Sequence, residues 1–103
     1  ARRGRITLED ATDQLIDDMR RSNPGIRVGQ GYRRGWLSGR GALSVIMIGD
    51  SPFGGSERDW IVTTFAPDGT FFYLIAVAPE SEFWAYERTF ETIFESVRFR
   101  GRQ

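Results

Sequence analysis

The chain has 103 residues, enough for one domain with a modest hydrophobic core. Its 14 cationic residues, all arginines, balance 14 acidic residues, and apolar residues make up 40% of the chain. Because the sequence holds no Cys, His or Lys, it excludes disulfides, thiolate metal sites, histidine base catalysis, Schiff-base lysines and lysine-dependent phosphate loops.

Charge is distributed unevenly along the chain. Residues 1–40 carry nine arginines against five acids, whereas residues 41–103 carry five arginines against nine acids. The arginines are scattered over several segments and no run exceeds two, so we interpret them as solvated surface and expect no nucleic-acid binding. No apolar run reaches the roughly 18 residues that cross a bilayer, and we expect no membrane contact by this segment.

The first helix is predicted to begin after Thr7, a favourable N-cap that is followed by Asp10 three residues later. Acids fill its early turns and two arginines its last turn, which suits the helix dipole. Asn23-Pro24-Gly25 ends it. The acids on its outer face are interpreted as solvated, because calcium loops need turns rather than a helix. Its core stripe is expected to consist of Leu8, Ala11, Leu15 and Met19, with Ile16 at the margin.

Residues 26–78 change to a strand pattern interrupted by turn signals. Glycines 29 and 31 predict a bulge or twist in the first strand. Because the connections are short, consecutive strands should form an antiparallel meander. The four expected strands cover residues 26–36, 42–49, 58–66 and 70–78.

Two of these strands, most clearly 70–78, are apolar on both faces. A sheet that is covered on one side only should alternate apolar and polar residues, so something must cover both faces. A second helix is predicted to follow, opened by Pro79 or Ser81. Trp84 lies about 100° off its core stripe, and we expect this ring to lie against a neighbouring loop or to contact a partner. The stripe consists of Phe83, Tyr86, Phe90, Ile93, Phe94 and Val97.

The loop sequence GDSPFGG raises the question of a serine nucleophile at Ser51. A catalytic serine needs a base within hydrogen-bond reach, and His and Lys are both absent. The G-x-S-x-G elbow is absent too, so we interpret the loop as a strand connection with positive-φ glycines. A carboxylate pair is another route to catalysis, but Asp50, Glu57, Asp59 and Asp68 are expected at strand ends, where acids are solvated. We expect no catalytic residue and no metal ligand in this chain.

Several motifs together give the chain a family resemblance that extends over almost its whole length. It resembles the accessory domain that follows the catalytic unit in bacterial, notably acidobacterial, membrane-associated HExxH zinc metallopeptidases. The motifs are structural rather than catalytic. They are LEDATDQLI (8–16), ALSV (42–45), SPFGG (51–55), APE (78–80) before an aromatic helix, and a closing SVR (96–98).

The resemblance implies a PsbP-like α+β fold. This is an α/β/α sandwich in which an antiparallel meander of four to five strands is flanked by an N-terminal and a C-terminal helix. Members of the family have further strands before the first helix, so the chain looks like the truncated C-terminal portion of a longer protein. Residues 1–103 are then one accessory domain, with a basic flexible start at residues 1–5. The HExxH motif is absent, so we expect no cofactor here and assign any zinc to the parent protein.

The leading functional expectation is a non-catalytic accessory or interaction domain attached to a zinc metallopeptidase, in the cell envelope or periplasm that the resemblance implies. The alternative is a small-ligand binding domain with a pocket between sheet and helix. An enzyme that uses carboxylates and arginines alone would need strongly shifted pKa values in one cleft. The candidate interaction surface consists of Trp84, Trp36, Phe53, Arg33 and Arg34.

Two partners are expected for this domain. The first is the parent peptidase domain. The second is another copy of the chain, because the loss of the early strands would leave an unpaired sheet edge and bare apolar surface. A homodimer would cover what the missing segment covers in the family.

Overall fold

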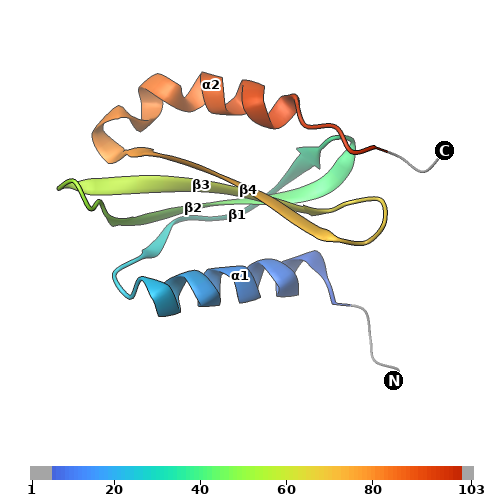
Figure 1. The fold of residues 1–103 in the computed structure, drawn as a ribbon, viewed down its shortest axis with the longest axis horizontal. Helices are drawn as coiled ribbons and strands as arrows, with labels where there is room; N and C mark the ends of the chain where they lie inside the picture. Colours follow the sequence, from blue (N-terminus) through green and yellow to red (C-terminus); the bar gives the residue numbers. More distant parts are fainter. Residues whose placement is uncertain (1–5, 101–103) are drawn as a thin grey trace.

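The computed structural model describes residues 6–100, which form three layers (Figure 1). The four-stranded sheet is the middle layer, with one helix on each face (Figure 1). The predicted α+β fold with a helix near each end is confirmed, whereas the predicted basic start lies outside the described residues. The elements are α1 (Leu8–Ser22), β1 (Arg27–Leu37), β2 (Arg40–Asp50), β3 (Ser56–Phe65), β4 (Phe71–Pro79), the 3₁₀ helix η1 (Glu80–Glu82) and α2 (Phe83–Glu95).

The sheet is the predicted antiparallel meander, with strand order β1-β2-β3-β4. Its connections are tight because their residues adopt the left-handed conformation. Ser38 and Gly39 form the β1–β2 turn with φ of 53° and 77°, and Gly69 has φ of 89° in the β3–β4 turn. Gly54 and Gly55 likewise have positive φ, as predicted for the β2–β3 loop.

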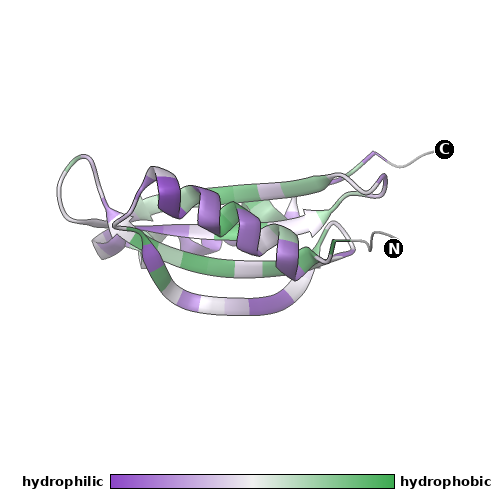
Figure 2. Cartoon of the chain, turned by 90° about the horizontal axis from the view of Figure 1, so that it is seen from below, coloured by the Kyte–Doolittle hydropathy of each residue, from purple (hydrophilic) through white to green (hydrophobic). Residues whose placement is uncertain are grey.

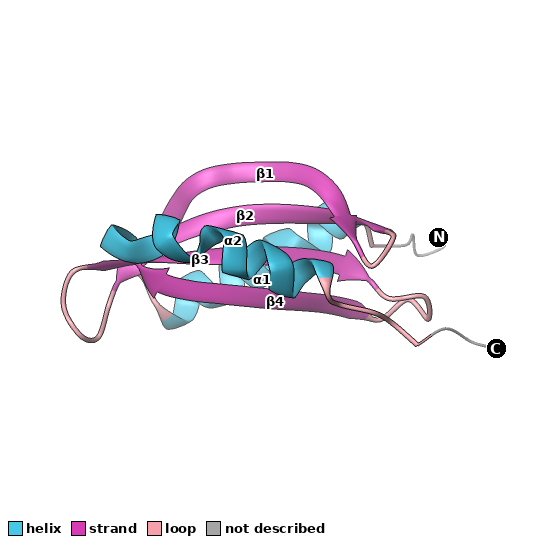
Figure 3. Ribbon diagram, turned by 90° about the horizontal axis from the view of Figure 1, so that it is seen from above, coloured by secondary structure: helices cyan, strands magenta, loops and turns pink. Residues whose placement is uncertain are grey.

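The irregularity predicted in β1 at Gly29 or Gly31 is present. The pairing of β1 with β2 shifts register between Val28 and Gln30 and again between Gln30 and Arg33. As a result, β1 bows away from β2 (Figure 3). Gly29 lies at the first shift, where a Cβ would lie 2.6 Å from the Cδ1 atom of Ile48, so a larger residue would force the Ile48 side chain to move.

α1 begins and ends where the sequence predicts. Thr7 caps it by accepting a hydrogen bond from the backbone N–H of Asp10, and Asn23 closes it. The centre of its buried face differs from the predicted stripe, however. Thr12 and Ile16 are buried together with Ala11, while Leu15 and Met19 pack at the margin. The hydrophilic side of α1 faces away from the sheet (Figure 2).

Beneath α1, the core on this face of the sheet is aliphatic. It combines Ile16 and Ile26 with Val45, Met47 and Ile61 of the central strands. A polar contact also joins the two layers, since the hydroxyl groups of Thr12 and Thr63 lie 2.8 Å apart and are buried. The core beneath α1 therefore holds a buried hydroxyl pair beside its aliphatic side chains.

The core beneath α2 is aromatic. Phe83 and Phe94 pack on Trp60 of β3. Their ring centroids lie 6.1 Å and 4.9 Å, respectively, from that of Trp60. The predicted stripe is wrong for two residues, because Tyr86 and Ile93 are exposed on the side of the helix toward β4. Tyr86 and Ile93 do not contact the sheet, because α2 packs on Trp60 through its phenylalanines. The side of the helix that carries Tyr86 and Ile93 therefore remains exposed.

Candidate functional site

α2 leaves part of the sheet uncovered, and a groove lies there between the helix and β1. Two cavities of about 270 and 300 Å³ form it, and they meet at Ser44 and Trp60. One wall comes from α2 and the other from β1, so the bowed edge strand faces the helix across an open trough. The residues that line it include Gln30, Arg33, Gly35, Trp36, Ser44, Trp60, Trp84, Glu87, Glu91 and Glu95.

All three tryptophans of the chain line this groove. Trp60 forms part of its lining and is held by edge contacts with the phenylalanines of α2. Trp84 and Trp36 are 64% and 78% exposed. Trp84 does not lie against a loop as expected; its ring packs on Phe83, and the guanidinium of Arg58 lies 5.6 Å from its centroid. The indole rings thus offer apolar surface at both ends of the trough.

The helix wall of the groove carries a row of carboxylates. Glu87, Glu91 and Glu95 follow one another at a spacing of four residues, which aligns them on one side of α2. None of them forms an ion pair within residues 6–100. Like charges at this spacing destabilise a helix, and acids near its C-terminus oppose the dipole. The repulsion along this row therefore destabilises α2, and a cation bound in the groove would relieve it.

One arginine, Arg33, lines the groove, and it lies in the cavity near Trp84. Arg33 lies on β1, and its guanidinium group is next to the side-chain amide of Gln30. When the amide is oriented with its oxygen toward Arg33, this oxygen accepts hydrogen bonds from Nη1 and Nε, each at 3.1 Å. The cavity between Trp36 and Trp60 is lined by Glu91 and Glu95 and by no cation. This half of the groove is therefore the more acidic.

The five residues predicted as an interaction surface do not form one patch. Trp84, Trp36 and Arg33 line the groove. Arg34, the next residue along β1, points to the opposite face, where it forms an ion pair with Glu9 of α1. Phe53 is 96% exposed in the β2–β3 loop, outside the residues that line the groove.

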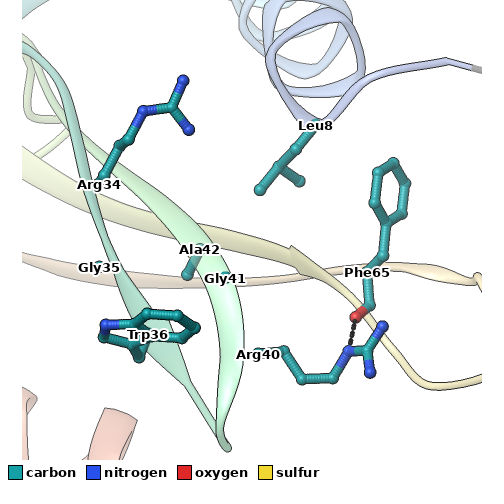
Figure 4. Close-up of a pocket in the computed structure, with 8 residues that line it drawn as sticks. All are labelled: Leu8, Arg34, Gly35, Trp36, Arg40, Gly41, Ala42 and Phe65. Atoms are coloured by element: carbon teal, nitrogen blue, oxygen red, sulfur yellow. Dashed lines mark hydrogen bonds between the residues drawn. The ribbon is translucent and has the colours of Figure 1, made fainter.

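A further cavity of about 440 Å³ lies on the α1 side of the β1–β2 hairpin (Figure 4). Leu8 and Phe65 supply apolar surface, and Trp36 reaches this cavity as well as the groove, so its ring lies at the edge of β1. Both arginines in the lining already have partners. Arg34 binds Glu9, and Arg40 donates to the Phe65 carbonyl at 2.6 Å (Figure 4). We interpret this cavity as a structural junction.

Ser51 belongs to a self-contained loop. Its hydroxyl accepts a hydrogen bond from the Phe53 backbone N–H at 3.1 Å, and its own N–H donates to the Gly55 carbonyl at 2.9 Å. These contacts hold the turn that joins β2 to β3, which is the connection that the sequence predicts.

The expectation that the four acids are solvated is wrong for Asp59. It is the fourth residue of β3, faces α1, and is only 6% exposed. Its carboxyl group meets that of Glu57, two residues earlier on the same face, and burial together with this neighbour raises the pKa of Asp59 to about 7. Its Oδ1 atom has no hydrogen-bond partner among the described residues. Period-two alternation with buried Ile61 and Thr63 was the signal that could have placed it inside.

Asp50 and Asp68 behave as expected, whereas Glu57 is half-buried beside Asp59. Asp50 is exposed at the end of β2, and Asp68 is exposed in the β3–β4 turn, where hydrogen bonds from Thr70 lower its pKa. Over residues 6–100, no three potential metal ligands gather at one place. Neither Glu57 nor Asp59 lines the groove or the cavity of Figure 4.

Comparison with known proteins gives no relative for this chain: no family model, curated protein or solved structure matches it. In the described part of the chain, neither helix is long and apolar enough to cross a membrane.

Proposed function

We propose that this chain is a non-catalytic interaction domain that binds a polypeptide partner in the groove between α2 and β1. The observation that carries the proposal is the combination of three tryptophans with an uncompensated row of glutamates along one open trough. Exposed indole rings bind the methylene chains and charged heads of basic side chains, and carboxylates attract them over a longer range. The partner segment is therefore extended and rich in lysine or arginine.

The resemblance supplies the biological setting of the proposal. The domain would belong to a bacterial zinc metallopeptidase of the cell envelope, have the PsbP-like form of the α/β/α sandwich, and position basic protein segments for the parent enzyme. The arrangement of one helix on each face of an antiparallel sheet is compatible with that form.

A small-ligand pocket is the second candidate. The cavity near Trp84 is bordered by Phe83 and Trp60 and brings Arg33, Ser44 and Glu87 together, so a few polar groups converge on apolar walls. Its volume of about 270 Å³ is at the small end for a ligand site, however, and it continues into the next cavity. This continuity favours an extended polypeptide.

The test is a binding titration, by calorimetry, of the isolated chain with two peptides of about eight residues. One alternates lysine with threonine, and the other alternates glutamate with threonine. We expect the lysine peptide to bind at least roughly tenfold more tightly, with an affinity that falls as salt increases. Replacing Glu91 and Glu95 by glutamine should remove the preference for the lysine peptide.

Matched aromatic variants locate the binding site. The double variant Trp36→Ser/Trp84→Ser should weaken binding about tenfold or more, whereas Phe53→Ser removes an even more exposed aromatic ring outside the groove and should have no effect. Equal binding of the two peptides, or loss of binding in Phe53→Ser alone, would contradict the proposal. In the parent enzyme, the groove variants should slow cleavage of a basic protein substrate while a short peptide is still cut.

A further inference from the structure

The two edges of the sheet differ in their capacity to pair with another strand. β1 has two register shifts and carries Arg27, Arg33 and Arg34. Bulges and charges are the devices by which proteins block edge pairing. β4 has neither, since its register with β3 is unbroken over its nine residues and none of them is charged. Proline also blocks edge pairing, but Pro79 is the last residue of the strand. Within residues 6–100 no strand pairs with the outer side of β4.

Apolar side chains surround this open edge on both faces. On the α1 face, Tyr73, Ile75 and Val77 are exposed, because α1 packs on the central strands and leaves this part of β4 uncovered. On the other face, Tyr86 and Ile93 project from the flank of α2. An apolar band of this kind beside an unpaired edge marks an interaction site.

We propose that β4 pairs antiparallel with β4 of a second copy, so that two chains share one continuous eight-stranded sheet. The register that pairs the whole strand has Ile75 at the two-fold axis, where it faces Ile75 of the partner subunit. Tyr73 then lies opposite Val77 of the partner subunit, an aromatic–β-branched pair of the kind that stabilises sheets.

The properties of the β4 edge favour a second copy of this chain as the binding partner. An antiparallel two-fold arrangement is self-complementary, since each side chain of the strip meets another member of the strip. The absence of charge from β4 provides nothing to select an acidic or basic partner, whereas it lets two identical strands meet without repulsion. The pairing also leaves the groove free, because β1 lies at the opposite edge.

The helices leave room for this assembly. α2 packs on Trp60 of β3 and also on β4, so the two α2 helices would lie two to three strand spacings apart, or roughly 10–14 Å. Helices in direct contact lie about 8–10 Å apart. The intervening space suits Tyr86 and Ile93, whose exposed side chains would meet those of the partner across the axis.

Cysteine cross-linking tests the register, since the chain has no cysteine of its own. Opposite residues on neighbouring strands lie about 4.5–5.5 Å apart, within reach of a disulfide. Mild oxidation should therefore convert Ile75→Cys to a covalent dimer. A mixture of the single variants Tyr73→Cys and Val77→Cys should give the mixed dimer. Val28→Cys, an exposed site on the opposite edge strand, should stay uncross-linked. Cross-linking of Val28→Cys but not of Ile75→Cys would overturn the proposal.

Sedimentation equilibrium tests the assembly without modification. The chain of 11.8 kDa should sediment with twice this mass at tens of micromolar. Ile75→Lys places two like charges at the axis and should raise the dissociation constant roughly 100-fold, while Val28→Lys should leave it unchanged. Circular dichroism of both variants verifies that they are folded, and Tyr73→Lys serves in place of Ile75→Lys if that variant unfolds. A monomeric wild-type chain at about 100 μM would refute the pairing.

Discussion

Replacing Asp59 by asparagine should stabilise the fold at pH 8 and flatten its dependence on pH. The carboxyl group lies within β3 between Met47 and Val77 of the neighbouring strands, almost fully buried. Burial first, and then the adjacent Glu57, raise its pKa from 3.8 to about 7. The folded chain therefore holds a proton at this site that the unfolded chain releases.

The magnitude follows from the size of this shift. About three pKa units at 1.36 kcal/mol each give about 4 kcal/mol. Because the folded pKa lies above the unfolded value, this stability is fully present below about pH 4 and is lost as the pH rises through 7. About 2 kcal/mol of the loss falls between pH 5 and 7. Asparagine removes the titration, and we expect a gain of roughly 2 kcal/mol at pH 8 after the cost of its second N–H group.

Urea unfolding followed by tryptophan fluorescence, at pH 5 and pH 8 and a fixed protein concentration, measures this effect. Glu57→Gln should give part of the gain, because it removes the second cause of the shift. Asp50→Asn, an exposed acid at the end of β2, is the matched control and should change little. A wild-type chain that is equally stable at both pH values would refute the reasoning, as would an Asp59→Asn chain that is less stable than wild type at pH 8.

Two further predictions concern the packing of the sheet, and both are measured as free energies of unfolding in urea. Thr12→Val should destabilise the fold by about 1–3 kcal/mol, because it leaves the Thr63 hydroxyl buried without its partner. The double variant Thr12→Val/Thr63→Val should lower the free energy of unfolding by less than the sum of the single changes. Additive effects would show that the two hydroxyl groups are independent. Gly29→Ala should cost about 1–3 kcal/mol, because its Cβ would meet Ile48, whereas Gly31→Ala, with no atom within 4 Å, should be tolerated; equal effects of the two changes would contradict the close approach.

The order and type of the elements could be predicted from local signals alone. Caps, turn glycines and the two-residue alternation act within a few positions, so Thr7, Gly39 and the bulges near Gly29 appear in the structure where the pattern places them. The apolar character of both faces of the last strand likewise indicated that something covers both sides of the sheet, and one helix packs on each face (Figure 1), although α1 leaves β4 itself exposed on its side.

The placement of helices over the sheet could not be predicted in the same way. Tyr86 and Ile93 share a helical face with Phe90, but only the position of α2 over Trp60 decides that they remain exposed. Asp59 is buried for the same kind of reason, since the packing of α1 against the central strands encloses it. The sequence indicated Trp84, Trp36 and Arg33 as interaction residues, but not that they line one groove with Trp60, because the three tryptophans come from separate elements whose juxtaposition depends on the tertiary fold.

The two bulges of β1 determine the valence of this domain in sheet pairing. A unit with two open edges can bind a neighbour on each side and grow into a filament without limit. A unit with one open edge is monovalent, and its association ends when that edge is filled. In the proposed dimer, the bowed, arginine-bearing β1 would leave β4 as the only edge open to pairing among the described residues, so assembly through the sheet would stop at pairs.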